Sequence, residues 1–469
     1  MPFTQSETIC AISTAPGGAI GIVRVSGPDS IRIVDKIFKG AYGKTLQSSK
    51  GYSAHFGEIQ DKDYVLDQVI VTVFRNPHSY TGEDMVEISC HGSGYILQGI
   101  INLLLEVDGN IRMATAGEFT KRAFINGKMD LTQSEAVADL IAANSKSSHD
   151  VAIKQIKGDY SVELKKLREQ FLTFASLIEL ELDFSDHEDL EFADRIQLKV
   201  LLEAIHKRVA TLVSSFKLGN AIKNGVSVAI VGNTNTGKST LLNTLLREDR
   251  AITSAVKGTT RDTIEDTITL QGILFRFIDT AGIRQTADEI ERIGIQRSID
   301  KIDQSSIVLW VVDATESKAS LEEQKDEMLP LLDNKNFIVL FNKEDLISSE
   351  TKETLKRWTN QLPRHVKYLF LSAKTKMHIA ELEKELVHIV QSQGNWGSDI
   401  IITNMRHYEA LKRALETVNR ISDGLYQQIP SDLLAQDIRE CIAYLGEILG
   451  EVTSEEVLQN IFSKFCIGK

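Results

Sequence analysis

The stretch that decides the fold runs from Val226 to Ser239 and reads VSVAIVGNTNTGKS. Its first half, up to Val231, is almost entirely apolar, which is typical of a buried strand. Its second half matches the pattern G-x-x-x-x-G-K-[ST], a loop whose glycines let backbone N–H groups turn onto phosphate oxygens. A helical segment from Ser239 to Leu246 follows, and its positive end would point at the same anion. This context favours a phosphate-binding loop over a chance match in a glycine turn.

Three more apolar strands precede polar motifs. The strand Leu274–Ile278 leads into DTAG at 279–282, Phe337–Phe341 into NKED at 342–345, and Tyr368–Leu371 into SAK at 372–374. An aspartate after the first strand can hold a magnesium-bound water, and Asp345 can accept hydrogen bonds from the guanine N1–H and 2-amino group. Adenine offers neither donor, so the set favours GTP over ATP and resembles the Ras-like, translation-factor-related GTPases. The expected GTP contacts are Asn235, Thr236, Gly237, Lys238, Ser239, Thr240, Asp279, Thr280, Ala281, Gly282, Asn342, Lys343, Asp345, Ser372, Ala373 and Lys374.

One position departs from the Ras pattern. The residue after Gly282 is Ile283, whose aliphatic side chain cannot orient a water molecule. Another group must position the nucleophile, or hydrolysis will be very slow. Asp288, Glu289 and Glu291 lie nearby, and each is also explained as a solvated charge at the start of a helix.

The pattern along the chain predicts a multidomain protein with α/β and all-α parts. Residues 1–118 mix strand candidates such as Val69–Phe74 with a helix at Tyr95–Val107, which indicates an α/β domain. Residues 119–218 and 386–469 are amphipathic and helical, including one stretch from Val151 to Asp183, and we expect them to form one discontinuous domain. Residues 219–385 alternate strands and helices, so they form the inserted GTPase domain.

Composition narrows the class of protein. The 469 residues are 42% hydrophobic and 25% charged, with a formal net charge of -12. No overall positive field therefore attracts nucleic acid, and any RNA contact needs local basic patches or a partner. The four cysteines lack metal-site spacing, no secretory signal opens the chain and no apolar run is long enough for a membrane span. We expect a reduced, cytoplasmic protein without membrane contact.

These motifs in this order closely resemble the family of bacterial tRNA modification GTPases known as MnmE or TrmE. The resemblance extends over essentially the whole chain. It is carried by DTAGIR at 279–284 with ERIG at 291–294, by GTTRD at 258–262 and by the terminal CIGK at 466–469.

For the GTPase site, the resemblance implies catalysis by Glu291 and a potassium ion in place of an arginine finger. The ion's ligands would be Asn235, Ser254, Val256 and Thr259, with Val256 serving through its backbone carbonyl. Mg²⁺ would be held by Ser239 and Thr260, and Ser254, Thr259 and Thr260 would join the GTP contacts. A cation placed where negative charge grows during phosphoryl transfer is chemically reasonable.

For the N-terminal domain, the resemblance implies homodimerisation and binding of 5-formyl-tetrahydrofolate or a related one-carbon folate. The folate-contacting positions of the family match Arg24, Glu87, Lys128 and Lys469. Without the resemblance, each of these residues is also explained as an ordinary surface charge. Cys466 matches a required cysteine of the family, although cysteine commonly behaves as a small buried hydrophobe.

The resemblance also implies a function. With a flavin-dependent partner of the MnmG (GidA) family, which would carry FAD and NADH, the protein would add a carboxymethylaminomethyl-type group to C5 of the wobble uridine, U34, of certain tRNAs. No G-x-G-x-x-G fingerprint for a dinucleotide occurs in this chain. A ribosome-assembly or signalling GTPase that binds RNA is the alternative. It explains residues 225–385 equally well but gives no reason for the N-terminal segment or the terminal CIGK.

Overall fold

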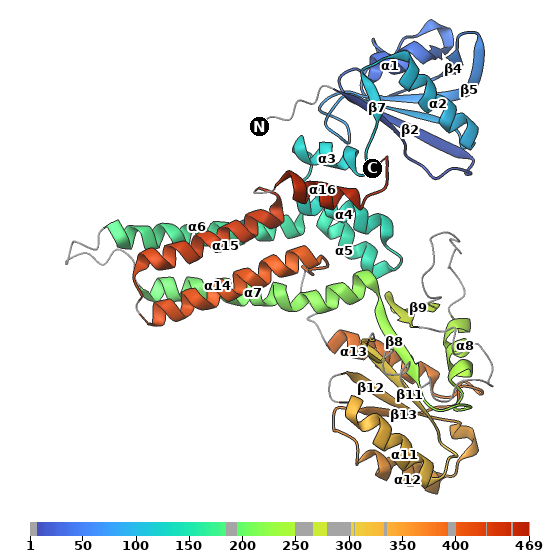
Figure 1. Cartoon of the computed structure of the whole chain (residues 1–469), viewed down its shortest axis with the longest axis vertical. Helices are drawn as coiled ribbons and strands as arrows, with labels where there is room; N and C mark the ends of the chain where they lie inside the picture. Colours follow the sequence, from blue (N-terminus) through green and yellow to red (C-terminus); the bar gives the residue numbers. More distant parts are fainter. Residues whose placement is uncertain are drawn as a thin grey trace. The chain divides into compact units, whose positions relative to one another are not determined.

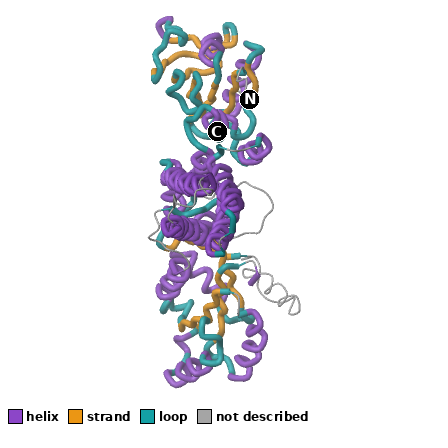
Figure 2. The backbone as a smooth tube through the Cα atoms, turned by 90° about the vertical axis from the view of Figure 1, so that its left-hand side faces the viewer, coloured by secondary structure: helices purple, strands orange, loops and turns teal. Residues whose placement is uncertain are grey.

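The computed structural model describes residues 7–183, 195–248, 266–278, 302–303, 305–332, 335–392, 400–427, 429–451 and 454–468. The chain divides into two compact units. The first contains Met1–Ile141, Ile153–Leu201 and Arg420–Lys469, and the second contains Ala142–Ala152 and Leu202–Asn419. Each unit holds one β-sheet, whose strands are the orange segments in Figure 2. The three-domain boundaries given above remain a prediction.

The sheet of the first unit has seven strands in the order β3-β4-β5-β6-β2-β1-β7. Helices α1 (Ser30–Ile37) and α2 (Gly94–Val107) cover one face of it (Figure 1). Alternation along the strands explains the packing: Val69, Val71 and Val73 are buried in the core, whereas Ile70 is 49% exposed. The strands are β1 (Thr8–Ile12), β2 (Ile20–Ser26), β3 (Phe38–Gly40), β4 (Ser53–Asp61), β5 (Tyr64–Phe74), β6 (Met85–His91) and β7 (Ile111–Met113).

The helical segments behave largely as their periodicity predicts, with one correction. The stretch expected as a single helix from Val151 to Asp183 is two helices, because Gly158 adopts a φ of +90° and ends the first of them. Helices α6 and α15 pack side by side, and α16 contacts α3 (Figure 1). The helices are α3 (Glu118–Ile125), α4 (Leu131–Ala142), α5 (Lys146–Ile156), α6 (Asp159–Asp183), α7 (Arg195–Asn224), α14 (Met405–Tyr426), α15 (Ser431–Leu449) and α16 (Glu455–Ser463).

The sheet of the second unit has the strand order β13-β12-β11-β8-β10-β9. All neighbouring pairs are parallel except β9 with β10. Every residue of β11 is buried, as expected for a strand covered by helices on both faces. The strands are β8 (Val226–Val231), β9 (Asp266–Leu270), β10 (Ile273–Phe277), β11 (Ile307–Asp313), β12 (Asn336–Asn342) and β13 (Lys367–Phe370), and the helices are α8 (Lys238–Glu248), α11 (Lys318–Met328), α12 (Ser349–Thr359) and α13 (Ile379–Ser392).

Candidate functional site

The phosphate loop lies between β8 and α8, as its sequence predicts. Gly232 and Gly237 have φ values of +139° and +95°, which side chains rarely adopt. Their hydrogens also face atoms at close range: a Cβ would lie 2.1 Å from the carbonyl oxygen of Val311 at Gly232, and 2.2 Å from Nδ2 of Asn342 at Gly237. Lys238 folds back over the loop and donates from Nζ to the Gly232 carbonyl at 2.8 Å. The loop is therefore shaped by close contacts with the Val311 backbone on β11 and the Asn342 side chain on β12.

Asn342, at the end of β12, links two of the predicted motifs. Its Nδ2 donates to the carbonyl of Thr236 in the phosphate loop at 2.7 Å, and its Oδ1 accepts from the N–H of Ala373 at 3.0 Å. Only 3% of the residue is exposed. The Ala373 carbonyl in turn accepts from the hydroxyl of Thr244 on α8 at 3.0 Å. Both ends of the Asn342 amide are thus used to hold the phosphate loop and the SAK loop together.

The residues expected around the base lie at the same edge of the sheet. Lys343 adopts a φ of +66° and forms an ion pair with Asp313, which ends the neighbouring strand β11. Asp345 is exposed, and its carboxylate receives no hydrogen bond from any described residue. Ser372 is fully buried, whereas Lys374 is exposed. Strands β8, β11, β12 and β13 are parallel, so they end at the same edge of the sheet. The groups that follow β11, β12 and β13 therefore lie at the same edge as the phosphate loop, which follows β8.

Several predicted site residues lie outside the described residues. They are Ser254, Val256, Thr259, Thr260, Asp279, Thr280, Ala281, Gly282, Glu291 and Lys469. Their assigned roles stay predictions.

In the first unit, Arg24 on β2 and Glu87 on β6 are cross-strand neighbours and form an ion pair. Arg24 donates from Nε at 2.9 Å and from Nη2 at 2.8 Å, both to Oε1 of Glu87. The guanidinium lies over the rings of Tyr80 and Phe119, with Cζ 5.4 and 5.6 Å from their centroids. Oε2 of Glu87 receives no hydrogen bond from the described residues, so one carboxylate oxygen is left for a ligand.

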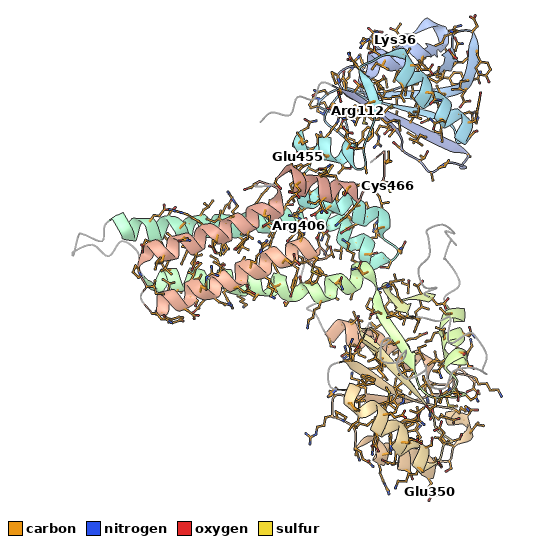
Figure 3. All side chains as sticks on the ribbon, viewed as in Figure 1. Lys36, Arg112, Glu350, Arg406, Glu455 and Cys466 are labelled. Atoms are coloured by element: carbon orange, nitrogen blue, oxygen red, sulfur yellow. The ribbon has the colours of Figure 1, made fainter. Side chains whose placement is uncertain are left out.

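The C-terminal tail reaches this ion pair. The carbonyl of Gly468 accepts from Nη1 of Arg24 at 3.3 Å and from the hydroxyl of Ser13 at 3.2 Å. Gly117 donates its N–H to the carbonyl of Cys466 at 3.4 Å. Gly468 has a φ of +94°, and a Cβ there would lie 2.4 Å from the carbonyl oxygen of Ile12. These contacts fix the backbone at both Cys466 and Gly468. Cys466, which is labelled in Figure 3, is thus two residues away from the carbonyl that Arg24 binds.

Comparison with known proteins decides the family. A model of the MnmE helical domain matches residues 131–466, and a model of the GTP-binding protein TrmE N-terminus matches residues 8–128. The tRNA modification GTPase MnmE of Bacteroides thetaiotaomicron is 53% identical over 99% of this chain and 100% of the relative. The MnmE protein of Flavobacterium psychrophilum is 48% identical over 99% of each chain.

The chain belongs to the family of tRNA modification GTPases MnmE.

Solved structures align more weakly. Era in complex with MgGDPNP and a fragment of 16S ribosomal RNA is 24% identical over 41% of this chain and 66% of Era, with a TM-score of 0.28. None of the helices in the described parts of this MnmE-family chain combines the length and the apolar character needed to cross a membrane.

The four cysteines of this MnmE-family chain fall into two kinds. Cys10, Cys90 and Cys441 are buried, and burial raises the pKa of their thiols to about 12, about 11 and about 12. Cys466 is exposed. Because the thiolate is the reactive form, the buried three are poor nucleophiles at neutral pH. Any cysteine chemistry with a molecule from solution therefore falls to Cys466.

Sequence reasoning did not find the residues that surround Arg24. Tyr80 and Phe119 flank its guanidinium, and Ser13 and Gly117 bind the tail. The only available signal was Gly468 of the terminal motif, because glycine commonly marks a close backbone approach. Lys128, which was predicted to meet the folate, is exposed and donates from Nζ to the Pro77 carbonyl at 3.0 Å.

Proposed function

We propose that this chain is a potassium-dependent GTPase that works with a flavin-dependent partner of the MnmG (GidA) family on tRNA. Together they would add a carboxymethylaminomethyl-type group to C5 of the wobble uridine, U34, in the cytoplasm. The observation that carries the proposal is the full-length similarity to MnmE proteins, with 53% sequence identity over 99% of the chain to one of them. The C-terminal tail supports it, because the tail that contains Cys466 binds Arg24 of the Arg24–Glu87 pair. FAD and NADH would belong to the partner, since this chain lacks a dinucleotide fingerprint.

The GTP site is supported by the geometry of the phosphate loop. Its left-handed glycines turn backbone N–H groups inward, and Lys238 is near enough to exchange its loop carbonyl for phosphate oxygens. The carboxylate of Asp345 receives no hydrogen bond from any described residue, so it is available to accept from guanine. The hydroxyls of Ser239 and Thr260 would hold Mg²⁺, because this ion prefers oxygen ligands.

Potassium dependence is supported by Asn235. This residue is exposed in the phosphate loop with a φ of +61°, and its carboxamide makes no hydrogen bond with the described residues. Its oxygen is therefore free to bind a cation together with Ser254, Thr259 and the carbonyl of Val256. A cation at this point supplies positive charge where the transition state gains negative charge.

This potassium proposal predicts that GTP hydrolysis by the full chain is much faster in potassium than in sodium buffer. A sodium ion is too small to contact all these oxygens at once. Turnover would be measured at equal ionic strength in the two salts, with nucleotide binding as the control. Equal rates in both salts would refute the cation's role.

A one-carbon folate is the ligand that best fits the Arg24–Glu87 pair. Oε2 of Glu87 can accept from the ring N–H and amino donors of a pterin, while Arg24 holds the carboxylate in place through Oε1. Lys128 and Lys469 can meet the folate carboxylates. Cys466 would take part in the one-carbon chemistry as the exposed thiol.

Homodimerisation is supported by the open face of the seven-stranded sheet, opposite α1 and α2. Phe56 on β4 pairs with Ile70 on β5, and they are 57% and 49% exposed. Ile20 on β2 is 66% exposed, and Tyr52 beside β4 is 70% exposed. Apolar side chains gathered on one sheet face favour burial against a second copy of the domain.

The alternative of a ribosome-assembly GTPase is not supported, because the family matches extend over residues 8–128 and 131–466 and the relatives are tRNA modification GTPases. The proposed chemistry is tested by reconstitution: the chain, a MnmG-family flavoprotein, tRNA, GTP, folate, NADH and an amine donor are combined, and the tRNA nucleosides are analysed. The proposal predicts a modified uridine only when the chain and GTP are both present. Product formed equally well without the chain would overturn it.

A further inference from the structure

Asp345, the residue proposed to bind the guanine base, is not held in place by its own side chain. It lies in the short 3-10 helix Glu344–Leu346, which follows β12, and its exposed carboxylate receives no hydrogen bond from any described residue. Before a nucleotide binds, the position of this carboxylate therefore depends on how its neighbours in the chain are fixed. Glu344, the residue directly before it, supplies the contacts that fix this turn.

The backbone of Glu344 is hydrogen-bonded on both sides. Its N–H donates to the carbonyl of Leu371 at 3.1 Å, and its carbonyl accepts from the N–H of Ile347 at 3.3 Å. Lys343 has a φ of +66°, and its carbonyl accepts from the N–H of Leu346 at 2.9 Å. These bonds close the turn of residues 343–347 and tie it to the residue that follows β13.

The side chain of Glu344 links the turn to two further elements. Nζ of Lys352 on α12 donates to its Oε1, and Nδ1 of His378, directly before α13, lies 2.7 Å from its Oε2. The Glu344 side chain is only 9% exposed. An ionised carboxylate can only accept, so Nδ1 of His378 carries the hydrogen whether the ring is neutral or charged. Both carboxylate oxygens of Glu344 are thus used within the protein, in contrast to those of Asp345.

The Glu344 carboxyl is ionised at neutral pH. Burial alone would raise its pKa, but the hydrogen bonds from Lys352 and His378 outweigh burial and hold the pKa below its usual value. Hydrogen bonds to an ionised group are stronger than those between neutral groups. The two links are therefore able to hold the turn in one position.

Both partners of Glu344 are themselves attached to the predicted base site. Nζ of Lys352 lies 4.9 Å from the centroid of the Phe370 ring, at the end of β13. His378 directly follows Met377, whose N–H and carbonyl pair with the carbonyl and N–H of Ser372 at 3.1 Å each. This pair closes the SAK loop. Through His378, Glu344 therefore joins the NKED turn to the closed end of the SAK loop.

We propose that Glu344 is a positioning residue for guanine recognition, because its carboxylate holds the NKED turn against α12 and the end of the SAK loop. The inference rests on the GTP site proposed above. The Asp345 carboxylate can accept from both the guanine N1–H and the 2-amino group only where both distances suit a hydrogen bond. A displacement of about 1 Å takes a hydrogen bond out of its distance range.

The test compares the affinities of the full chain for GTP and for inosine triphosphate, which keeps the N1–H but lacks the 2-amino group. E344M is the informative variant, because methionine has a similar length but binds neither Lys352 nor His378. We expect GTP to lose more affinity than inosine triphosphate, so that the preference for GTP falls about tenfold, the scale for one hydrogen bond to a charged group. E344Q can still bind Lys352 through its oxygen, so its preference should be intermediate.

The matched control is E385M. Glu385 on α13 also forms an ion pair with a lysine, Lys367 on β13, and its Oε1 lies 3.8 Å from Nδ1 of His388. Neither partner belongs to the NKED turn or to the SAK loop. We expect E385M to keep the GTP preference of the wild type, even if the loss of its ion pair lowers the melting temperature.

A purely structural role for Glu344 gives a different result. If E344M weakens GTP and inosine triphosphate by the same factor, Glu344 only stabilises the domain and the proposal is wrong. K352M removes one of the two links at a side chain that is 33% exposed, and provides the same comparison if E344M folds poorly. Its preference for GTP should fall in the same direction, and an unchanged preference would likewise overturn the proposal.

D345A separates this inference from the proposed GTP site. If D345A keeps the preference for GTP over inosine triphosphate, Asp345 does not bind the base and the proposed site itself is wrong. If D345A loses the preference while E344M keeps it, the site stands and only the role of Glu344 is refuted.

Discussion

Replacing Asn342 by alanine should uncouple the two loops that enclose the nucleotide. The buried amide makes two hydrogen bonds, to the Thr236 carbonyl and from the Ala373 N–H. Alanine leaves both backbone groups without a partner, and Thr236 and Ala373 are 0% and 2% exposed. Each orphaned buried group costs about 1–3 kcal/mol. The pair therefore costs about 2–6 kcal/mol, and bound GTP requires both loops in place.

The expected result is a GTP dissociation constant raised at least about 30-fold, which corresponds to about 2 kcal/mol. Binding of a fluorescent GTP analogue would be measured at a temperature well below the melting temperature of each variant. N336A is the matched control: Asn336 begins the same strand β12, is exposed, and donates to the Ser306 carbonyl at 3.3 Å. Its GTP affinity should be unchanged.

Two outcomes would refute the reasoning about Asn342. If N342A melts at a lower temperature but binds GTP normally, the residue only stabilises the fold. If N342A changes the preference between guanine and adenine nucleotides, the loss of affinity comes from the direct GTP contact predicted for Asn342 and not from its link between the loops. A residue that only links the loops should weaken all guanine nucleotides by a similar factor.

Three further substitutions test the other assigned roles. D345N should weaken GTP binding and favour xanthosine triphosphate, because xanthine has a carbonyl where guanine has its amino group; unchanged base preference would remove Asp345 from the base site. E291A should lower GTP turnover about 10²–10⁴-fold with little change in binding, and an equally steep loss of binding would mean that Glu291 is structural. C466S should abolish tRNA modification while sparing GTP turnover and melting temperature, and normal modification in this variant would return Cys466 to a packing role.

The GTPase part of the fold could be predicted from sequence because its signals are local. The strand and loop from Val226 to Ser239 are one contiguous string, and the structure places β8 and α8 where that string predicts them. Strand β12 lies in a sheet that is covered on both faces, so its apolar run was enough to predict it as Phe337–Phe341. The equally apolar strand β11 was not among the predicted strands.

The N-terminal sheet was harder to predict. Strand β4 contains a glycine and charged residues, and only part of one face is buried, so its alternation is weak. The break at Gly158 was missed because the apolar period continues on both sides of it.

The surroundings of Arg24 could not be predicted at all from local pattern. The residue contacts Gly468, which is 444 positions away, and Ser13 contacts the same carbonyl from 455 positions away. Such contacts depend on how α3, α16 and β2 pack together. The spacing of apolar residues along the chain carries no information about that packing. Only the resemblance to a family singled out Arg24, Glu87 and Cys466 beforehand.

The central claim is that this chain is required for modification at the wobble uridine of tRNA. The most direct measurement is nucleoside analysis, by mass spectrometry, of tRNA from cells that lack the chain. Cells supplied with the wild-type chain, E291A or C466S provide the comparison. The account predicts that the carboxymethylaminomethyl-type uridine disappears without the chain and returns only with the wild type. Unchanged levels of that nucleoside in cells lacking the chain would contradict it.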